Sequence, residues 1–555
     1  MNLFDASEFG IFPGSSDQYS VRIQEVLNHL PPESCLRFLP GEYDFLPGSS
    51  IPFSLHVSNS YQSDNLYAAI FGKGLNHIHL DWQGSHLIFH EDLSPFVFLN
   101  CSDIQIHNLS IDWKVPFSAE ATVVNACKEW VDITIDAQQY PHRIEDGALL
   151  FLQENGTETP LFGVMEFDHS THKVRAGAGD TFPGNTIAVP ADNDMIRLKG
   201  SFSIPPEVGN ILVLRHGKRI HPGFLADHCN DIQIQNIQVH HTAGLGMLFQ
   251  FCRNIDVVQT DFIPSPSSGR KIISGHDDGL HFSNCMGKIL VEHCNFYGLM
   301  DDSINVHGTS VKILEKISPH VLRCGYIHPQ SYGFPKWACS GDHISCLDHK
   351  TLKSLGERTV SSFRLLNEKE FEITFLEPLP ELLHAGDALE NITNTPSLLC
   401  QYNYFGSCRA RGVLVTTPQP VEIHHNFFES SGSAILLSGD ANQWYESGAC
   451  QKVSIHHNLF LECCTSQYQF CSGIISIEPE ILDPQENYSF HQNLVISENT
   501  FVSKENHPCV YAKCSSGVHF INNTIFCTNS SLPVLDHSFC REISSANNIM
   551  QLLGR

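Results

Sequence analysis

A short unit of the form apolar-x-apolar-x-x-Asn-x-apolar recurs along the chain and constrains its fold more than any other feature. It occurs at 103–111, 231–239, 289–297, 421–429, 453–461, 494–502 and 518–526. Several of the intervals are close to one value, since Asn499 and Asn523 are 24 residues apart and Asn403 and Asn426 are 23 apart. Short strands at a fixed period predict a parallel β-helix with one coil per unit. We expect the recurring asparagines to stack at one turn as a side-chain ladder.

Two segments interrupt this period. Residues 114–214 and 309–392 lack the unit and alternate apolar and polar residues as antiparallel hairpins do, for example in "EFEITFLEPL". The predicted fold is therefore all-β: a right-handed parallel β-helix of the pectate-lyase type with two inserted small antiparallel β-barrels. The predicted divisions are a cap with the first coils (1–113), barrel 1 (114–214), coils that carry paired carboxylates (215–308), barrel 2 (309–392) and C-terminal coils (393–555).

One short helix is expected near the N-terminus. Ile23, Val26, Leu27 and Leu30 follow the i, i+3, i+4, i+7 pattern, and Pro31-Pro32 ends it. A single amphipathic helix before many strands predicts a cap on the solenoid.

The composition limits the partners. The chain has 33 Lys+Arg against 60 Asp+Glu among its 555 residues, which argues against nucleic acid, an anionic membrane or a polyanionic substrate. No apolar run is long enough to span a bilayer, and "MNLFDASEFG" lacks the features of a signal peptide. We expect a soluble protein, cytoplasmic as the sequence stands, and secreted or periplasmic if a signal peptide has been removed.

Its 20 scattered cysteines predict buried reduced thiols. The oligomeric state stays open, with a homodimer as one option.

Two carboxylate pairs lie one period apart, in "GHDDGLHF" (275–282) and "LMDDSINV" (299–306). Asp277 precedes Asp301 by 24 residues, and Asp278 precedes Asp302 by 24. Stacked coils would place these side chains roughly 4.8 Å apart, where they repel one another and shift each other's pKa. A structural role would need cations, for which Arg270, Lys271 and Lys288 are the nearest in sequence, with three flanking histidines also able to contribute. A calcium site and two solvated turns are the alternatives.

Crowded carboxylates suit glycoside hydrolysis. That chemistry needs one carboxylic acid that holds a proton for the leaving oxygen and one or two ionised carboxylates. A proton shared among neighbouring negative charges creates this division. An inverting enzyme additionally needs a carboxyl separation of roughly 6.5 to 9.5 Å. Diagonal partners on adjacent coils can be farther apart than directly stacked ones, and therefore nearer to this range.

A single Asp followed one coil later by an Asp-Asp pair resembles the site of the polygalacturonases, glycoside hydrolase family 28, which invert. The resemblance makes Asp301 the general acid and Asp278 with Asp302 the residues that position the water as base. The Asn-Thr-Asp and Arg-Ile-Lys motifs of that family are missing here, as are the basic contacts to galacturonate that they imply.

A closer resemblance is to glycoside hydrolase family 110. It is carried by "HDDGLHF", "GLMDDSINVHGT", "RARGVLVTT" (409–417) and "SGDANQWYESGA" (438–449), and by a β-helix with two barrel insertions. The resemblance implies an inverting exo-α-galactosidase that hydrolyses terminal α-1,3-linked galactose from glycans such as the blood-group B antigen. It also implies that linear α-1,3-galactosides are candidate substrates. We expect a glycan partner, no cofactor and no metal, because no histidine spacing is typical of a metal site.

Ten further residues are predicted to bind substrate. They flank the carboxylates or lie in the long turn at 438–449, where Trp444 would stack on a sugar face or pack under the loop, and Asp440 would accept from hydroxyls or cap the turn. Arg411 would reach the same face or serve as a structural ion-pair partner. The ten are Asp277, His276, His281, Asn305, His307, Arg411, Asp440, Asn442, Trp444 and Glu446.

Two other functions remain open. A pectate-lyase-like enzyme would use the aspartates to bind calcium and would lose activity on chelation. A non-catalytic glycan-binding β-helix would bind without releasing sugar, and it leaves the crowded carboxylates without a reason.

Overall fold

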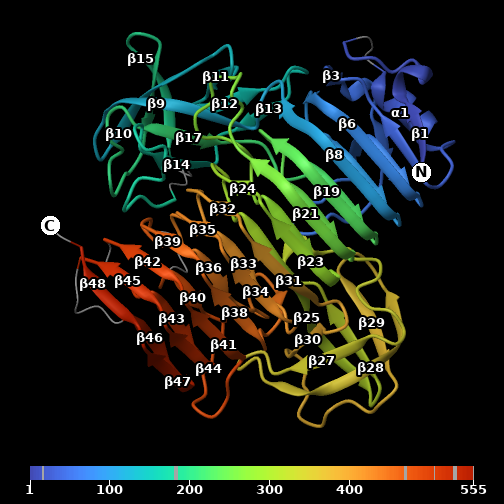
Figure 1. The fold of residues 1–555 in the computed structure, drawn as a ribbon, viewed down its shortest axis with the longest axis vertical. Helices are drawn as coiled ribbons and strands as arrows, with labels where there is room; N and C mark the ends of the chain where they lie inside the picture. Colours follow the sequence, from blue (N-terminus) through green and yellow to red (C-terminus); the bar gives the residue numbers. More distant parts are fainter. Residues whose placement is uncertain (15–17, 181–185, 468–471, 505–506, 529–533, 554–555) are drawn as a thin grey trace.

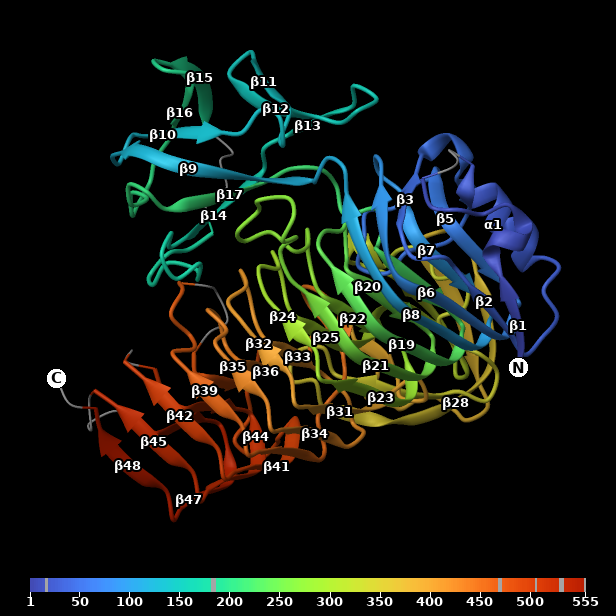
Figure 2. The same ribbon diagram turned by 45° about the horizontal axis from the view of Figure 1, so that its top comes forward.

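The computed structural model describes residues 1–14, 18–180, 186–467, 472–504, 507–528 and 534–553. Its coils run from the N-terminal end to the C-terminal end of one solenoid, and two inserted β-domains project from it (Figures 1 and 2).

One long parallel sheet, sheet 1, forms two faces of the solenoid. Its first ladder of strands contains β1 (Asn2–Asp5), β2 (Ser34–Arg37), β6 (Asn76–Phe89), β8 (Ser102–Trp113), β19 (Asn230–Val239), β21 (Arg253–Phe262), β23 (Met286–Glu292), β31 (Pro396–Gln401), β34 (Val421–His424), β38 (Val453–His456), β41 (His491–Ser497), β44 (Ser515–Ile521) and β47 (Arg541–Ala546). After a turn the chain continues into a second ladder, which shares β6, β8, β19 and β21. Its other strands are β3 (Glu42–Phe45), β24 (Asn295–Phe296), β32 (Tyr404–Phe405), β35 (Phe427–Phe428), β39 (Leu459–Leu461), β42 (Thr500–Ser503), β45 (Thr524–Cys527) and β48 (Ile549–Leu552).

A second parallel sheet, sheet 2, forms the remaining face and carries the site described below. Its parallel strands are β5 (Leu66–Lys73), β7 (Ser94–Leu99), β18 (Phe224–Asp227), β20 (Met247–Gln250), β22 (Leu280–Ser283), β25 (Ile304–Ser318), β33 (Val413–Val415), β36 (Ile435–Leu437), β40 (Ile475–Ile477), β43 (Val510–Lys513) and β46 (Leu535–Ser538). Two short strands pair antiparallel at its edges, namely β4 (Ile51–Phe53) with β5 and β37 (Glu446–Ser447) with β25.

The predicted asparagine ladder is present in the C-terminal coils, where each amide donates to the next asparagine Oδ1 at 3.0 or 3.1 Å. It consists of Asn403, Asn426, Asn458, Asn499, Asn523 and Asn548. Asn236 donates to Asn108 at 2.7 Å in a separate short stack. Asn295 lies outside the ladder and donates to Asp261, because in that coil Cys294 occupies the ladder position and its N–H donates to Asn403. The ladder satisfies polar groups at buried turns, which would otherwise cost free energy.

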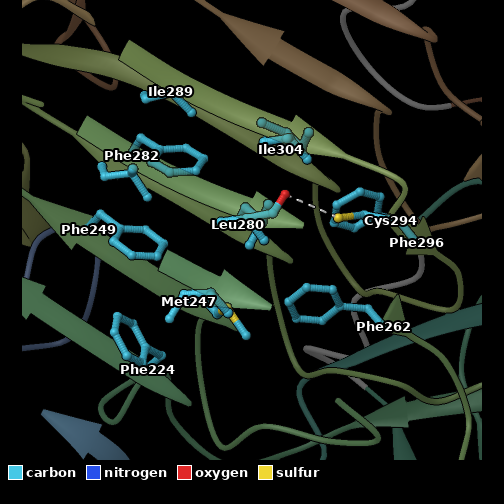
Figure 3. Packing of buried hydrophobic residues seen from close by; sticks show 14 of the residues in the cluster. Phe224, Met247, Phe249, Phe262, Leu280, Phe282, Ile289, Cys294, Phe296 and Ile304 are labelled. Atoms are coloured by element: carbon cyan, nitrogen blue, oxygen red, sulfur yellow. Dashed lines mark hydrogen bonds between the residues drawn. The ribbon is translucent and has the colours of Figure 1, made fainter. Parts of the chain in front are cut away.

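Apolar side chains of successive coils stack inside the solenoid (Figure 3). Phe224, Phe249 and Phe282 follow one another in sheet 2 with ring centroids 5.3 and 5.1 Å apart. Phe262 and Phe296 form a parallel stack in sheet 1 at 5.5 Å. A fully buried side chain of this size contributes roughly 1.5–3 kcal/mol, so a coil slipped by one residue would lose this packing along its whole length.

The predicted capping helix is α1 (Tyr19–Leu27), which packs against β3 and β5. Its buried face includes Ile23, Val26 and Leu27, as the periodicity predicts. The helix ends at Leu27, so Leu30, the fourth predicted position, lies beyond it as a partly buried residue. Three short 3₁₀ turns complete the helical content of the described residues: η1 (Ala6–Phe9), η2 (Pro47–Ser49) and η3 (Pro329–Ser331).

Barrel 1 consists of two antiparallel sheets around one core of buried side chains. The larger sheet has the order β14-β17-β9-β10-β16-β15, and the smaller sheet has the order β11-β12-β13. The strands are β9 (Ser118–Ala126), β10 (Trp130–Ile135), β11 (His142–Glu145), β12 (Ala148–Leu152), β13 (Glu158–Pro160), β14 (Gly163–Phe167), β15 (Ile187–Ala191), β16 (Met195–Lys199) and β17 (Ile211–Arg215).

Barrel 2 is a closed antiparallel ring that begins in β25, which leaves sheet 2 and continues into the barrel. The ring order is β25-β26-β29-β28-β27-β30 and back to β25. Its other strands are β26 (Val321–Gly325), β27 (His343–Leu347), β28 (Ser354–Leu365), β29 (Glu370–Phe375) and β30 (Ala388–Asn391). The predicted all-β parallel β-helix with two insertions and a capping helix is confirmed.

The cysteines of the described residues are all free and most are buried, in agreement with the prediction of reduced thiols. Within the same residues, no helix is both long and apolar enough to cross a membrane.

Glu390 of β30 is a buried carboxyl whose Oε2 has no hydrogen-bond partner. Burial raises its pKa to about 7. An acid with a raised folded-state pKa stabilises the fold fully below its unfolded-state value and loses that contribution as pH rises through the folded value. We expect Glu390→Gln to remove a pH-dependent penalty of up to about 3 kcal/mol. The thermal midpoint of the variant should exceed that of the parent at pH 8 more than at pH 5; an equal difference at both would contradict the assignment.

Candidate active site

The two aspartate pairs precede adjacent strands of sheet 2. Asp277 and Asp278 lie just before β22, and Asp301 and Asp302 lie just before β25. The strands pair in parallel with Leu280 opposite Ile304, which is the 24-residue offset that the sequence predicts. Asp278, Asp301 and Asp302 each bring one carboxylate oxygen within 4.8 Å of the others. The three carboxylates therefore form one cluster.

Arg219 contacts three of the four aspartates. Its guanidinium nitrogens are 3.5 Å from Asp278 Oδ2, 3.6 Å from Asp301 Oδ2 and 3.9 Å from Asp277 Oδ2. Arg215, the last residue of β17, adds a contact of 3.3 Å to Asp277. Both arginines lie where the chain leaves barrel 1 and returns to the solenoid, so the insertion delivers the positive charge that the aspartates need.

Two more arginines come from the segment 409–411 on the next coil. Arg411 donates two parallel hydrogen bonds of 2.7 Å to Asp302, the bidentate geometry that fixes a carboxylate most firmly. Arg409 donates to Asp301 at 3.2 Å and also pairs with Asp180 of barrel 1 through Nε at 2.7 Å. Four arginines thus offset four aspartates.

The cations predicted from sequence proximity are not the ones used. Arg270 instead forms an ion pair with Asp112 at 2.6 Å, and the backbone N–H of Lys271 donates to Glu120. Lys288 lies on β23 of sheet 1, away from the carboxylate cluster. In this fold, contacts are made between residues that are opposite each other on adjacent coils, or that lie where a barrel joins the solenoid. The prediction of these three cations used distance along the chain instead.

Histidines complete the cluster, as expected for two of the three that flank it. His276 Nδ1 lies 2.6 Å from Asp277 Oδ2, and His281 Nδ1 lies 2.6 Å from Asp278 Oδ2. His281 Nε2 is 2.9 Å from His307 Nε2, and His307 Nδ1 is 2.7 Å from the Gly308 carbonyl.

This chain of contacts limits where the protons lie. A carbonyl only accepts, so Nδ1 of His307 donates to Gly308. With two neutral imidazoles, His307 Nε2 accepts from His281, whose Nδ1 then has a lone pair, and the hydrogen bond to Asp278 needs a proton on Asp278 Oδ2.

The pKa shifts agree with this assignment. Burial, together with the charges of Asp301 and Asp302, raises the pKa of Asp278 well above its usual value, although Arg219 opposes the shift. Burial, with His307 and Arg219, lowers the pKa of His281 well below its usual value. Burial also raises the pKa of Asp302 against the charge of Arg411. For Asp277 the charges of Arg219, His276 and Arg215 overcome burial and lower the pKa.

The cluster lies in a pocket of about 150 Å³. This is below the roughly 300–1,000 Å³ of pockets that enclose drug-sized ligands, so the space suits one small ring. Of the predicted residues, those that line it are Asp278, Asp301, Asp302, His281, Asn305, Arg411, Asp440, Trp444 and Glu446.

Two of the predicted turn residues face the pocket in different ways. Trp444 is 48% exposed at the mouth, with its ring 4.7 Å from that of His328. Asp440 accepts four backbone N–H groups of its own turn, from Asn442 to Tyr445, so its capping role is confirmed.

Four other predicted residues lie outside the lining. Asp277, His276 and His307 are buried behind it and hold their neighbours in place. Asn442 points to barrel 2 and donates to the His349 carbonyl at 2.9 Å.

The sequence reasoning missed several residues of the pocket: Asn59, Arg219, Gln330, Arg409, Ser438, Glu478 and Glu480. Asn59 donates to Glu446 at 3.1 Å from a segment that no motif marks. Burial and the charges of Asp440 and Glu446 raise the pKa of Glu480 to about 7. Two quoted motifs carried a usable signal: "RAR" (409–411) contains Arg409 two residues before Arg411, and "SGDANQWYESGA" (438–449) begins with Ser438.

Asp180 links barrel 1 to the acid predicted from the resemblance. Arg409 donates to Asp180 and also contacts Asp301, so Asp180→Asn removes the carboxylate that holds this arginine beside the predicted acid. We expect kcat/KM on an α-1,3-galactoside to fall. The matched control is Asp132→Asn, which breaks the Asp132–Arg197 pair of barrel 1. An unchanged kcat/KM, or an equal loss in the control, would contradict the link.

Comparisons with known proteins agree with this architecture. Two family models match, the GLAA-B beta-barrel domain I at residues 119–212 and the GLAA-B beta-barrel domain II at residues 321–389. The chain is 37% identical over 569 residues to the alpha-1,3-galactosidase B of Bacteroides thetaiotaomicron, which covers 100% of this chain and 92% of the relative. It is 34% identical over 529 residues to the alpha-1,3-galactosidase B of Akkermansia muciniphila, covering 94% of this chain and 66% of the relative.

Among solved structures, the A-module of the Azotobacter vinelandii mannuronan C-5 epimerase AlgE6 aligns with a TM-score of 0.43 and 9% identity, covering 99% of both chains. That score is too low to support a conclusion. The identity to the curated relatives, which extends over the whole chain and both insertions, is sufficient: the chain belongs to the α-1,3-galactosidase family, glycoside hydrolase family 110.

Proposed function

We propose that the protein is an exo-acting α-galactosidase that hydrolyses terminal α-1,3-linked galactose by a single displacement with inversion. The observation that carries the proposal is the cluster of three carboxylates, Asp278, Asp301 and Asp302, at the base of a small pocket. The names of the curated relatives supply the linkage. A pocket with space for one ring suits the terminal sugar of a chain.

Asp301 is the proposed general acid. Its side chain is 20% exposed, whereas Asp278 and Asp302 are almost fully buried. It is therefore the carboxyl that an incoming glycosidic oxygen meets.

Asp278 and Asp302 are proposed to hold the attacking water. The resting cluster keeps its proton on Asp278, so the reactive state requires that proton to reach Asp301, across a cluster whose nearest oxygens lie within 4.8 Å. Binding of substrate over Asp301 supplies the free energy for this transfer.

Inversion rests on the resemblance to two inverting families. The nearest-oxygen distance within the cluster is shorter than the roughly 6.5–9.5 Å separation usual for inverting enzymes. The stereochemistry of the product is therefore the measurement that decides between inversion and retention.

A neutral sugar suits the pocket better than a uronic acid. Each arginine of the lining holds an aspartate: Arg219 contacts three, Arg409 contacts Asp301, and Arg411 binds Asp302 in a bidentate pair. A galacturonate carboxylate would have to compete with these contacts and would face Glu478 and Glu480. This favours the galactosidase over the polygalacturonase-like alternative.

The test is incubation with blood-group B trisaccharide, linear galactose-α-1,3-galactose and an α-linked galacturonide, each with and without EDTA. We expect release of galactose from an α-1,3-galactoside, no release of galacturonate, and the same rate with EDTA. An unsaturated product that absorbs in the ultraviolet and disappears with EDTA would identify a lyase. Binding without release would identify a non-catalytic glycan-binding protein.

A further inference from the structure

Two histidine pairs lie on consecutive coils, outside the pocket described above. They occur in "IHHN" at 423–426 and again at 455–458, and the register places His424 opposite His456. The second histidine of each pair has a positive φ, 54° at His425 and 55° at His457. In an extended strand, adjacent side chains point to opposite faces; this left-handed turn brings both rings of a pair together. The rings also stack between coils, at 4.9 and 5.0 Å.

The ring nitrogens of each pair converge. Nδ1 of His424 lies 2.8 Å from Nδ1 of His425, and Nδ1 of His456 lies 2.9 Å from Nδ1 of His457. In the second pair both outer nitrogens also face carboxylates: His457 Nε2 lies 2.7 Å from Glu498 and His456 Nε2 lies 3.3 Å from Glu422.

The tautomers decide whether each Nδ1–Nδ1 contact is an ordinary hydrogen bond or a meeting of two lone pairs. A neutral imidazole has a single N–H. If both Nε2 atoms donate to their carboxylates, then both Nδ1 atoms present lone pairs to each other at 2.9 Å. Such an arrangement is repulsive unless a proton or a metal ion lies between them. Imidazoles that bind metals commonly donate the other N–H to a carboxylate, as both do here.

We propose that His456 and His457 chelate one divalent transition-metal ion through their Nδ1 atoms. At a metal–nitrogen distance of about 2.1 Å, nitrogens 2.9 Å apart subtend an angle near 90°. This is the cis angle of square-planar or octahedral coordination, so the site suits Cu²⁺ or Ni²⁺ better than tetrahedral Zn²⁺. The His457 side chain is 47% exposed, so water can fill the remaining positions. His424 and His425 offer a second, weaker position, because a second ion one coil away would be repelled by the first.

Adjacency in sequence is not sufficient for such a site. His240 and His241 also follow one another, but both are buried. His240 Nδ1 is hydrogen-bonded to the Ile263 carbonyl at 2.9 Å, and His241 Nε2 accepts from the Phe117 N–H at 2.8 Å. One ring nitrogen of each is therefore held by a backbone group and both rings are buried, unlike those of the two pairs on the solenoid surface.

The test is titration of the full chain with NiCl₂ at pH 7.5 in a non-chelating buffer, followed by calorimetry. We expect the His456→Ala/His457→Ala double variant to bind its tightest Ni²⁺ at least tenfold more weakly than the parent. The single variant His457→Gln, which keeps a polar side chain, should weaken binding in the same direction if the double variant folds poorly. The control is His77→Ala, which removes an exposed histidine that contacts one carboxylate, Asp103; its affinity should match that of the parent.

The electron paramagnetic resonance spectrum of the Cu²⁺ complex gives an independent readout, because two imidazole nitrogens split the signal. Galactosidase activity should be the same in parent and double variant, since the pair lies outside the pocket. Equal Ni²⁺ affinity in parent and double variant, or a Cu²⁺ spectrum without nitrogen splitting, would overturn the proposal.

Discussion

Asp301→Asn should lower kcat on an α-1,3-galactoside by a factor of roughly 10²–10⁴, the usual contribution of a general acid. The amide cannot donate the proton that the departing oxygen needs. It keeps the shape of the carboxyl and can still contact Arg409, so the fold should survive. Circular dichroism and the thermal midpoint should therefore change little.

A change of leaving group separates the acid from the base. An aryl α-galactoside with a strongly acidic phenol needs little protonation, so Asp301→Asn should lose much less activity on it than on the natural disaccharide. Asp278→Asn and Asp302→Asn should lose activity on both substrates alike, because the water must be positioned in either case. The reverse pattern, with Asp278→Asn rescued by the good leaving group, would make Asp278 the acid; the proton that the histidine chain places on Asp278 makes this the outcome to watch for.

Arg219→Gln should have the largest effect on stability. Its guanidinium contacts Asp277, Asp278 and Asp301 and is only 14% exposed. Removal of one partner of a buried ion pair typically costs about 3–5 kcal/mol, because it leaves uncompensated charge. We expect a loss of this size in the free energy of unfolding at pH 7, measured by chemical denaturation. Arg253→Gln, which removes an exposed arginine from β21, is the control and should cost little.

The same variant should change the pH dependence. Arg219 lowers the pKa of Asp278, so without it that pKa rises further. Because the proton that Asp301 delivers rests on Asp278, the cluster then keeps this proton to higher pH, and the alkaline limb of kcat/KM should move upward. Asp277, whose depressed pKa also depends on Arg219, contributes stability above its unfolded-state pKa, and that contribution should shrink. An unchanged alkaline limb together with native-like stability would contradict the central place given to Arg219.

The sequence was sufficient for the parts of the site that follow the coil period. A 24-residue spacing predicts that Asn305 lies one coil beyond His281, and the register places these two residues opposite each other. The same period predicts the asparagine ladder of the C-terminal coils. It fails at Asn108 and Asn236, which stack separately, and at Asn295, where the turn is shifted by one residue and Cys294 takes the position. Such a shift changes no apolar pattern and is therefore invisible in the sequence.

The remainder of the site depends on where the insertions return to the solenoid. Arg215 ends the last strand of barrel 1 and Arg219 follows it, Asp180 lies in a loop of that barrel, and Gln330 comes from barrel 2. Periodicity gives the phase of a residue within its coil. Periodicity does not predict how a barrel packs against the solenoid, so the cations predicted from distance along the sequence were wrong.

The most direct test of the account is proton NMR of the sugar first released from an α-1,3-galactoside, recorded before mutarotation. The account holds that Asp301, Asp278 and Asp302 act together in a single displacement. It predicts that the first anomer to appear is β-galactose, which then equilibrates with the α form. Initial α-galactose would show retention, and with it a covalent intermediate on one of these aspartates, and would contradict the central claim.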